Sequence, residues 1–469
     1  MFKKFYILFL VAIVSSCRNP IISSTSSFSE TSATHIDEQS FITSDSFRVG
    51  VLLPLTGEAS KIGQGLKQST MLALEDMNNS NLILQFYDTL SSPEGARVAA
   101  ENAINQRVKM IIGPLMSTEV AAISDITRRH DIPVITFSTN EAVLLDHIYT
   151  IGLLIEEQID RIVSYATSQG KSRFALLIPD NANGIAVARS ALAATQKRGA
   201  SVVKIAFYPP ETADFSEIIR QLSDFDNRSQ PIKKEKQRLL ALVKNGDVSA
   251  KQALKKLNLK ETARGVDFDA LIIPETGGRL KSAAAMFGYY DVFAPDVMFL
   301  GTSVWENTSL NNEAILNKAV YPRLSRNHND YFNKKYMSLF GNYPNSLYAF
   351  AYDAVALSSV LARRNPSNLE QAITNPDGFS GINGVFRFFN NGKNQHSLDI
   401  IRITPSADVV IDSAPDNFAY QTQSSYDADI ANLYDNMPPV IFGKDNAEAQ
   451  NQIFGRQLNF SGNQNSDAY

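Results

Sequence analysis

The sequence predicts an α/β protein in which the chain forms two lobes, each built on a doubly wound parallel sheet. Short apolar stretches of strand length alternate with longer stretches in which apolar residues recur every three or four positions. This alternation is typical of parallel strands connected by covering helices. It runs from about residue 47 to residue 412. That length exceeds the usual size of one hydrophobic core, so two domains are expected.

The elements of each lobe follow from this pattern. Strands of the first lobe are expected at 48–54, 82–88, 108–114, 132–138 and 147–153. Helices are expected between them at 63–78, 92–106 and 118–131. The first helix should bury one face, made of Leu66, Ser69, Thr70, Ala73, Leu74 and Met77. Strands of the second lobe are expected at 173–180, 200–207, 268–275, 296–303 and 318–322.

The N-terminal segment has the pattern of a secretory signal. Two lysines precede the apolar run Phe5–Val14, and Ser15, Ser16 and Cys17 follow it. The run is too short to span a membrane. Because residues 14–17 resemble a bacterial lipobox, we expect residues 1–16 to be a lipoprotein signal peptide and Cys17 to be lipidated. The alternative is an ordinary cleaved signal with an incidental cysteine.

Two polar segments flank the predicted lobes. Residues 17–46 are rich in Ser and Thr, and such a segment buries too little apolar surface to fold, so it is expected to be a tether. Residues 413–469 are rich in Asn, Gln, Asp and Tyr and are expected to be largely irregular. Within this tail, the stretch 430–443 is expected to be able to pack as one short segment.

Composition and motifs argue against several classes of function. Cys17 is the only cysteine in 469 residues, so no internal disulfide, cysteine nucleophile or thiolate metal site is expected. The net charge of −4 argues against nucleic acid as a partner. No phosphate-binding loop, dinucleotide fingerprint, nucleophile elbow or metal-ligand spacing occurs, and the five histidines are scattered. The sequence therefore predicts no catalytic residue, no metal and no cofactor.

Polar residues at the ends of predicted strands indicate a binding site instead. Ligands of open α/β sheets bind at the carboxyl ends of the strands. Ser117 and Thr118 follow the third strand, and Ser138, Thr139 and Asn140 follow the fourth. The alternative is that these residues only form helix caps and turns.

The stretches 49–78 and 111–144 resemble the leucine/isoleucine/valine-type periplasmic binding proteins, which have the type I binding-protein fold. The resemblance covers about residues 47–412. It implies two lobes joined by three chain crossings, with a ligand in the cleft between them. The expected boundaries are 47–153 with 323–385 for lobe 1, and 154–322 with 386–412 for lobe 2.

The resemblance also implies roles for individual residues. Ser117 matches the hydroxyl that holds a ligand carboxylate, and Ser138–Asn140 match the segment that contacts the same ligand. Asn183 stands where the family has an aromatic residue in the cleft. Ser303 stands where the family has the acidic partner of a ligand ammonium group. Glu275 is a candidate substitute for that acid.

Residues 268–287 and 301–307 are similar to a second group with this fold, the penicillin-binding protein activators. This similarity implies a non-catalytic, lipid-anchored periplasmic protein that regulates peptidoglycan synthesis, held to the outer or inner membrane and partnered by a peptidoglycan synthase. The alternative is a substrate-binding lipoprotein that delivers an amino acid to an ABC permease.

A basic segment interrupts the second lobe at residues 229–262. It is expected to form two helices, with Leu239, Leu240, Leu242, Val243, Leu254 and Leu257 on their apolar face. One interpretation is a docking surface for a protein or an anionic polymer. The other is a solvated excursion without a partner.

Overall fold

The computed structural model describes residues 46–326, 329–418 and 440–442. The predicted signal peptide, the lipidation site Cys17 and the tether lie outside the described residues, as does most of the C-terminal tail. The predictions made for these segments therefore stay predictions.

The first lobe contains a five-stranded sheet with the order β2-β1-β3-β4-β5, and all of its strands are parallel. The strands are β1 (Phe47–Leu53), β2 (Leu82–Asp88), β3 (Met110–Ile112), β4 (Val134–Thr136) and β5 (Ile148–Thr150). Each lies within or overlaps one of the five predicted strands.

Helices cover both faces of this sheet. The helices are α1 (Ser60–Met77), α2 (Pro93–Asn105), α3 (Ser117–Arg129), α10 (Asn329–Phe340), α11 (Ser346–Arg364) and α12 (Leu369–Ile373). Val49 and Val51 of β1 pack in one core with α1 and α11, whereas Leu52 packs in another with α2 and α3. Neighbouring strand residues point to opposite faces, so one strand serves both cores. The predicted apolar face of the first helix packs in the α1–α11 core.

The second lobe contains an eight-stranded sheet with the order β15-β14-β10-β9-β8-β6-β7-β16. Its central strands are β6 (Arg173–Pro179), β7 (Ser201–Tyr208), β8 (Ala270–Ile272), β9 (Met298–Leu300) and β10 (Val320–Leu324), and they are parallel. The antiparallel strands β14 (Leu398–Ile403) and β15 (Asp408–Asp412) extend one edge. The other edge is extended by β16 (Val440–Phe442), which pairs with β7. Among the described residues of the tail, 440–442 therefore contribute one short strand to this sheet.

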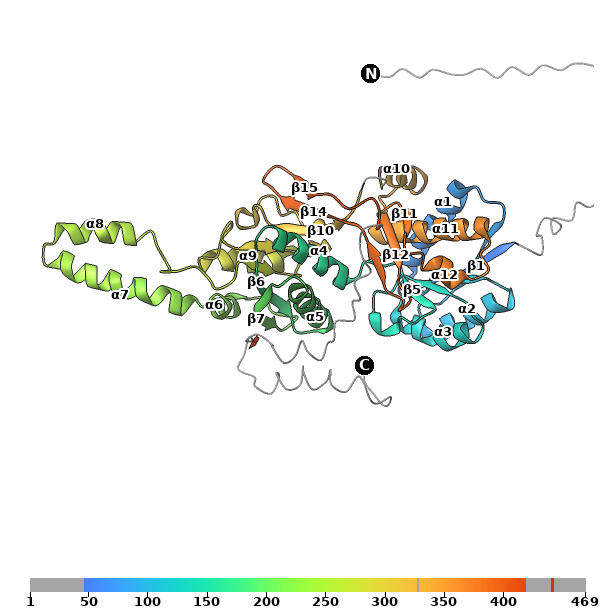
Figure 1. Ribbon diagram of the computed structural model, residues 1–469, viewed down its shortest axis with the longest axis horizontal. Coiled ribbons are helices and arrows are strands. Elements are labelled where there is room, and N and C mark those ends of the chain that lie inside the picture. Colours follow the sequence, from blue (N-terminus) through green and yellow to red (C-terminus); the bar gives the residue numbers. More distant parts are fainter. Residues whose placement is uncertain (1–45, 327–328, 419–439, 443–469) are drawn as a thin grey trace, which may run out of the picture. The chain divides into compact units, whose positions relative to one another are not determined.

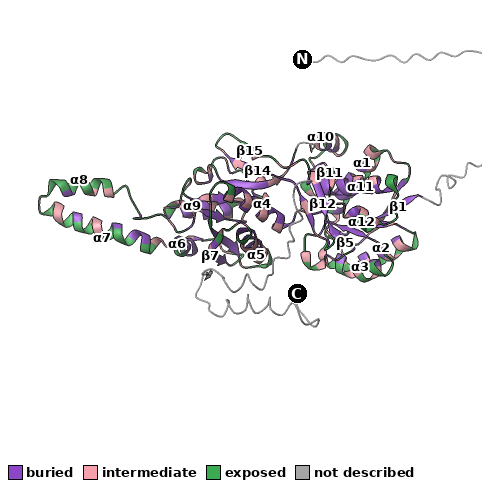
Figure 2. Ribbon diagram, viewed as in Figure 1, coloured by how far each residue is buried: buried purple, intermediate pink, exposed green. Residues whose placement is uncertain are grey.

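Four helices flank this second sheet, and its two faces have separate cores. The helices are α4 (Ile155–Ser168), α5 (Ala182–Gln196), α6 (Ser216–Leu222) and α9 (Gly277–Tyr289). A helical hairpin of α7 (Phe225–Lys244) and α8 (Val248–Leu257) is inserted between α6 and β8, at the position of the predicted basic segment. Figure 1 shows this hairpin projecting from the lobe, and Figure 2 shows that most of its surface is exposed.

The chain passes between the two sheets three times: after β5, after β10 and after β13 (Asn394–His396). A small antiparallel sheet of β11 (Phe379–Gly381), β12 (Gly384–Phe388) and β13 precedes the last crossing. Phe386 and Phe388 of β12 belong to the first lobe's core. The last crossing therefore occurs at Ser397, 11 residues beyond residue 386, where the second lobe was expected to resume.

Asp353 of α11 holds the turn between β11 and β12 against the first lobe. Its side chain is buried, and its Oδ1 accepts a hydrogen bond from the Ile382 N–H at 2.7 Å. Burial raises the pKa of Asp353 to about 7, although backbone N–H groups of Ile382 and Asn383 favour the charged form. The turn is therefore attached through a carboxyl group that takes up a proton at unusually high pH.

We expect this group to make the protein less stable as the pH rises. An unfolded Asp titrates near pH 4, so between about pH 4 and 7 the folded chain binds a proton that the unfolded chain does not. The free energy of unfolding should therefore fall through this range, by roughly 2–3 kcal/mol between pH 5 and pH 8. Urea denaturation of wild type and Asp353→Asn at both pH values isolates this contribution. Parallel pH profiles for the two proteins would contradict the assignment.

Candidate ligand-binding site

Two residues with hydroxyl side chains follow β3. Ser117 and Thr118 open α3, and their side chains form no hydrogen bond within the described part of the chain. Neither residue caps the helix. The position before the first turn is held by Met116, and its N–H donates to Glu119 Oε2 at 3.1 Å. The two hydroxyls are therefore available to a ligand.

The segment after β4 is more constrained. Ser138 is buried, and its carbonyl oxygen accepts a hydrogen bond from Thr150 Oγ1 at 2.7 Å. Asn140 Oδ1 accepts from the Ala142 N–H at 3.1 Å and so caps the short 3₁₀ helix η2 (Glu141–Val143). Thr139, between them, is exposed. Because β3 and β4 are adjacent parallel strands, the structure brings both predicted polar segments to one edge of the first sheet.

The predicted residues of the second lobe also share one edge. Asn183, Glu275 and Ser303 follow β6, β8 and β9, three neighbouring strands. Asn183 is exposed in the first turn of α5, which Asn181 caps. Ser303 opens the 3₁₀ helix η3 (Ser303–Asn307), and its N–H donates to Gln158 Oε1 at 2.9 Å. Both edges are thus supplied with short polar side chains.

Glu275 is already engaged inside the second lobe. Its Oε2 accepts hydrogen bonds from Tyr208 Oη and Arg279 Nε, each at 2.9 Å. Its Oε1 accepts from the Thr276 N–H at 3.0 Å. Burial, together with the nearby Glu275, raises the pKa of Tyr208. A ligand ammonium at Glu275 would therefore compete with the Arg279 guanidinium.

Four charged residues form a network beside these edges. Glu141 Oε2 lies 3.3 Å from an Arg189 nitrogen and 3.1 Å from Lys393 Nζ, and Lys393 Nζ lies 2.6 Å from Glu156 Oε2. Glu141 directly follows Asn140 in the first lobe, whereas Arg189 lies on α5 and Glu156 on α4 of the second. Burial raises the pKa of Glu156 in spite of the nearby Lys393. Sequence reasoning did not identify this network, because its members carry no common motif.

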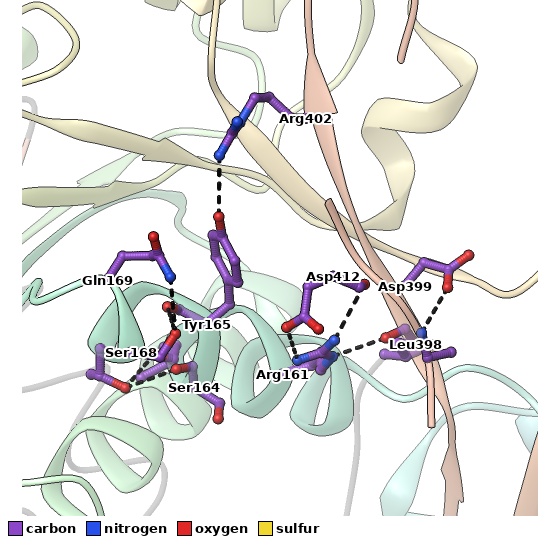
Figure 3. A network of polar contacts seen from close by, with 12 residues as sticks. Arg161, Ser164, Tyr165, Ser168, Gln169, Leu398, Asp399, Arg402 and Asp412 are labelled. Atoms are coloured by element: carbon purple, nitrogen blue, oxygen red, sulfur yellow. Dashed lines mark hydrogen bonds and ion pairs between the residues drawn. The ribbon is translucent and has the colours of Figure 1, made fainter. Parts of the chain in front are cut away.

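A separate cavity of about 490 Å³ lies against α4, the β13–β14 connection and the segment after β15. Arg161 of α4 lies in its wall, where it donates to the Leu398 carbonyl oxygen at 2.9 Å and pairs with Asp412 at 3.0 Å (Figure 3). None of the eight predicted ligand-site residues lines this cavity. It is therefore distinct from the candidate site at the strand ends.

Among the described residues, no group of three or more His, Cys, Asp or Glu side chains is arranged to hold a metal ion. Within the same residues, no helix is both long enough and apolar enough to cross a membrane.

Comparison with known proteins identifies the architecture. Residues 46–230 match the sequence model of the periplasmic binding protein family. A protein assigned as a branched-chain amino acid ABC transporter, from Rhodospirillum rubrum, superposes with a TM-score of 0.61 at 16% identity, over 78% of this chain and 100% of that one. This is the type I periplasmic-binding-protein fold. The resemblance seen in the sequence is confirmed for the fold, whereas that to the penicillin-binding protein activators stays a prediction.

Other matches are more distant or shorter. The solute-binding protein of an ABC transporter from Rhodopseudomonas palustris has a TM-score of 0.50 at 15% identity, over 79% of this chain and 99% of that one. The Leu/Ile/Val-binding protein homolog 3 of Brucella melitensis is 25% identical over 37% of this chain and 50% of its own length. The uncharacterized protein RP748 of Rickettsia prowazekii is 28% identical over 28% of this chain and 34% of its own length. The chain thus spans a third to a half of the curated relatives it matches.

Lys393 provides a test of the charged network in this binding-protein fold. We expect Lys393→Met to lower the free energy of unfolding by about 1–3 kcal/mol near pH 8, because the half-buried Glu156 loses its cation. This loss of stability should become smaller toward pH 5, because protonation of Glu156 removes its uncompensated charge. Urea denaturation at both pH values measures the effect, with Lys61→Met at an exposed site as the control. A loss independent of pH, or equal in the control, would argue against the network.

Proposed function

We propose that this chain is a periplasmic, non-catalytic solute-binding protein that serves an ABC transporter of the branched-chain amino-acid type. The observation that carries the proposal is the pair of hydroxyls of Ser117 and Thr118 at the carboxyl edge of the first sheet, which no side chain or backbone group of the described residues engages. Ligands of such folds bind at this edge. The fold adds support, and so does the sequence similarity to a Leu/Ile/Val-binding protein homolog.

The polar groups favour a particular class of solute. Hydroxyls and backbone N–H groups near Ser117 and Thr139 suit a carboxylate. On the second lobe, Ser303 stands at the position of the family's acidic residue, and Glu275 is occupied by Arg279 and Tyr208. An α-ammonium group buried there would lack a counter-charge, which is costly. We therefore propose an organic carboxylate without an α-ammonium group as the solute. The Rhodopseudomonas palustris protein of this fold was solved with such an acid, 3,4-dihydroxybenzoic acid.

A matched pair of ligands tests this proposal. We expect 4-methyl-2-oxopentanoate to raise the thermal midpoint. Leucine has the same carbon skeleton and carboxylate but carries an ammonium group at C2 in place of the keto oxygen, and it should leave the midpoint unchanged. A ligand at 100 times its Kd stabilises the folded state by about 2.7 kcal/mol, which differential scanning fluorimetry detects as a shift of several degrees. Aromatic carboxylates such as benzoate extend the panel.

Two variants check where the ligand binds. Ser117→Ala should weaken carboxylate binding by about 1 kcal/mol through loss of one hydrogen bond. Ser303→Asp should allow leucine to bind by restoring the counter-charge. If leucine raised the thermal midpoint of the wild type, the proposed transport function would stand, but the proposed class of solute would be refuted. No shift with any carboxylate or amino acid would refute the function itself.

Regulation of a peptidoglycan synthase, the function that the sequence ranks first, is the second candidate. The α7–α8 hairpin favours it, because solute capture alone does not need such a projecting element. Affinity purification from solubilised envelope separates the candidates. Recovery of an ABC permease supports solute delivery, and recovery of a synthase in its place supports regulation.

Lipid attachment at Cys17 is tested independently of the solute. We expect Cys17→Ser to accumulate as uncleaved precursor that incorporates no labelled fatty acid, because only the thiol can accept the diacylglycerol group. Electrophoretic mobility and metabolic labelling measure the two effects. Normal maturation of the serine variant to a soluble form would show that the segment is an ordinary cleaved signal.

A further inference from the structure

The α7–α8 hairpin concentrates positive charge on an otherwise acidic protein. Residues 229–262 contain nine Lys or Arg and three Asp or Glu, a net charge of +6, whereas the whole chain has a net charge of −4. Eight of the nine basic residues are lysines. The hairpin is therefore a separate electrostatic unit within the second lobe.

Most of this charge faces solvent and is not neutralised by the protein. Arg238 pairs with Glu235 at 2.7 Å, and Lys236 lies 3.9 Å from Glu261. The other lysines are exposed and take part in no salt bridge within the described part of the chain. They are Lys233, Lys234, Lys244, Lys251, Lys255, Lys256 and Lys260.

The root of the hairpin is fixed to the lobe by a buried arginine. Arg228 is 1% exposed, and its guanidinium donates to the carbonyl oxygens of Ser223, Tyr290 and Asp291 at 2.8–3.1 Å. It also donates to the Arg264 carbonyl oxygen at 3.1 Å, beyond the end of α8. One side chain thus joins the chain before and after the hairpin to the end of α9. The hairpin is presented in a defined direction, as a docking element requires.

The two helices use their apolar residues mainly against each other. Leu239 and Ala250 are buried, and Leu242, Val243, Leu254 and Leu257 are half-buried. Leu240, expected on the same face, is exposed, as are Val248 at the tip and Leu259 after α8. The outer surface therefore carries mainly lysines and other polar residues, with a few isolated apolar side chains, and has no continuous apolar face for a partner helix.

We propose that the α7–α8 hairpin binds the anionic headgroups of a phospholipid bilayer. Lysine ammonium groups are strongly hydrated point charges, suited to a diffuse layer of phosphates, whereas specific ion pairs with proteins favour arginine. Clusters of four to eight basic residues bind anionic membranes, with about a fivefold gain per residue near the surface. Isolated exposed residues such as Val248 and Leu259 reach the interface without inserting deeply. The contact would orient the lobes toward a membrane to which Cys17 is expected to tether them.

Vesicle flotation tests the proposal with the chain from residue 18 onward, which lacks the signal peptide and the lipid site. We expect binding to vesicles of phosphatidylcholine with 30% phosphatidylglycerol and none to pure phosphatidylcholine. Raising the salt from 50 to 300 mM should weaken binding at least tenfold, because the interaction is electrostatic. Binding should not depend on any solute, so this result is independent of the function proposed above.

Matched variants locate the contact. Reversal of Lys244, Lys251, Lys255 and Lys256 to Glu should reduce binding more than a hundredfold. The control reverses Lys61, Arg107, Lys318 and Lys334, which lie outside the hairpin, and changes the net charge equally. If the Glu variant does not fold, a variant with Gln at the same four hairpin positions takes its place, because Gln preserves helix propensity. Equal binding of hairpin and control variants, or no binding of the wild type, would overturn the proposal. Hairpin-dependent cross-linking to an envelope protein without vesicle binding would assign the surface to a protein partner instead.

Discussion

Glu157 is the side chain on which the connection between the two lobes depends. It lies in the first turn of α4, just after the first crossing, and is buried. Its carboxyl oxygens accept hydrogen bonds from the Leu154 N–H at 2.8 Å and from the His396 N–H at 2.6 Å. His396 directly precedes the last crossing. One carboxyl group therefore caps a helix and joins two of the three crossings, and its removal would leave buried N–H groups in both without a partner.

The surrounding contacts reinforce the same point of the fold. Asn394 Nδ2 donates to the Gly152 carbonyl oxygen at 2.7 Å, and Lys393 bridges Glu141 and Glu156. The last residues of the small sheet thus bind both the first crossing and the loop that carries Thr139 and Asn140. If the two lobes move apart at the candidate site, they must either rotate about these hydrogen bonds and ion pairs or break them. Because Glu141 and Arg189 also pair across the lobes, the charged network is the part of the protein where solute binding and lobe movement would be coupled.

Local patterns in the sequence were sufficient for the strands and for the fold, but not for contacts between distant segments. The alternation of apolar and helical stretches located the strands of both central sheets. The pairing of Glu157 with His396, which is separated from it by more than half the chain, leaves no periodic signal. The engagement of Glu275 by Tyr208 was missed for the same reason, since an acidic residue after a strand looks equally free or bound in sequence. Capping of α3 by Glu119 in place of Ser117 depends on backbone geometry that composition does not specify.

The position of the hairpin explains how one lobe can carry two unrelated surfaces. It is inserted in the connection from β7 to β8, and these strands keep their places on either side of β6. Long insertions in surface connections cost little loop-closure entropy. The hydrogen bonds of Arg228 also hold together the two ends of the inserted segment. Substitutions along the carboxyl edge with Asn183 and Ser303 therefore need not disturb the hairpin, and substitutions in the hairpin need not disturb that edge. Since a fold alone does not determine function, differences among proteins of this architecture are to be sought in these two places rather than in the sheets.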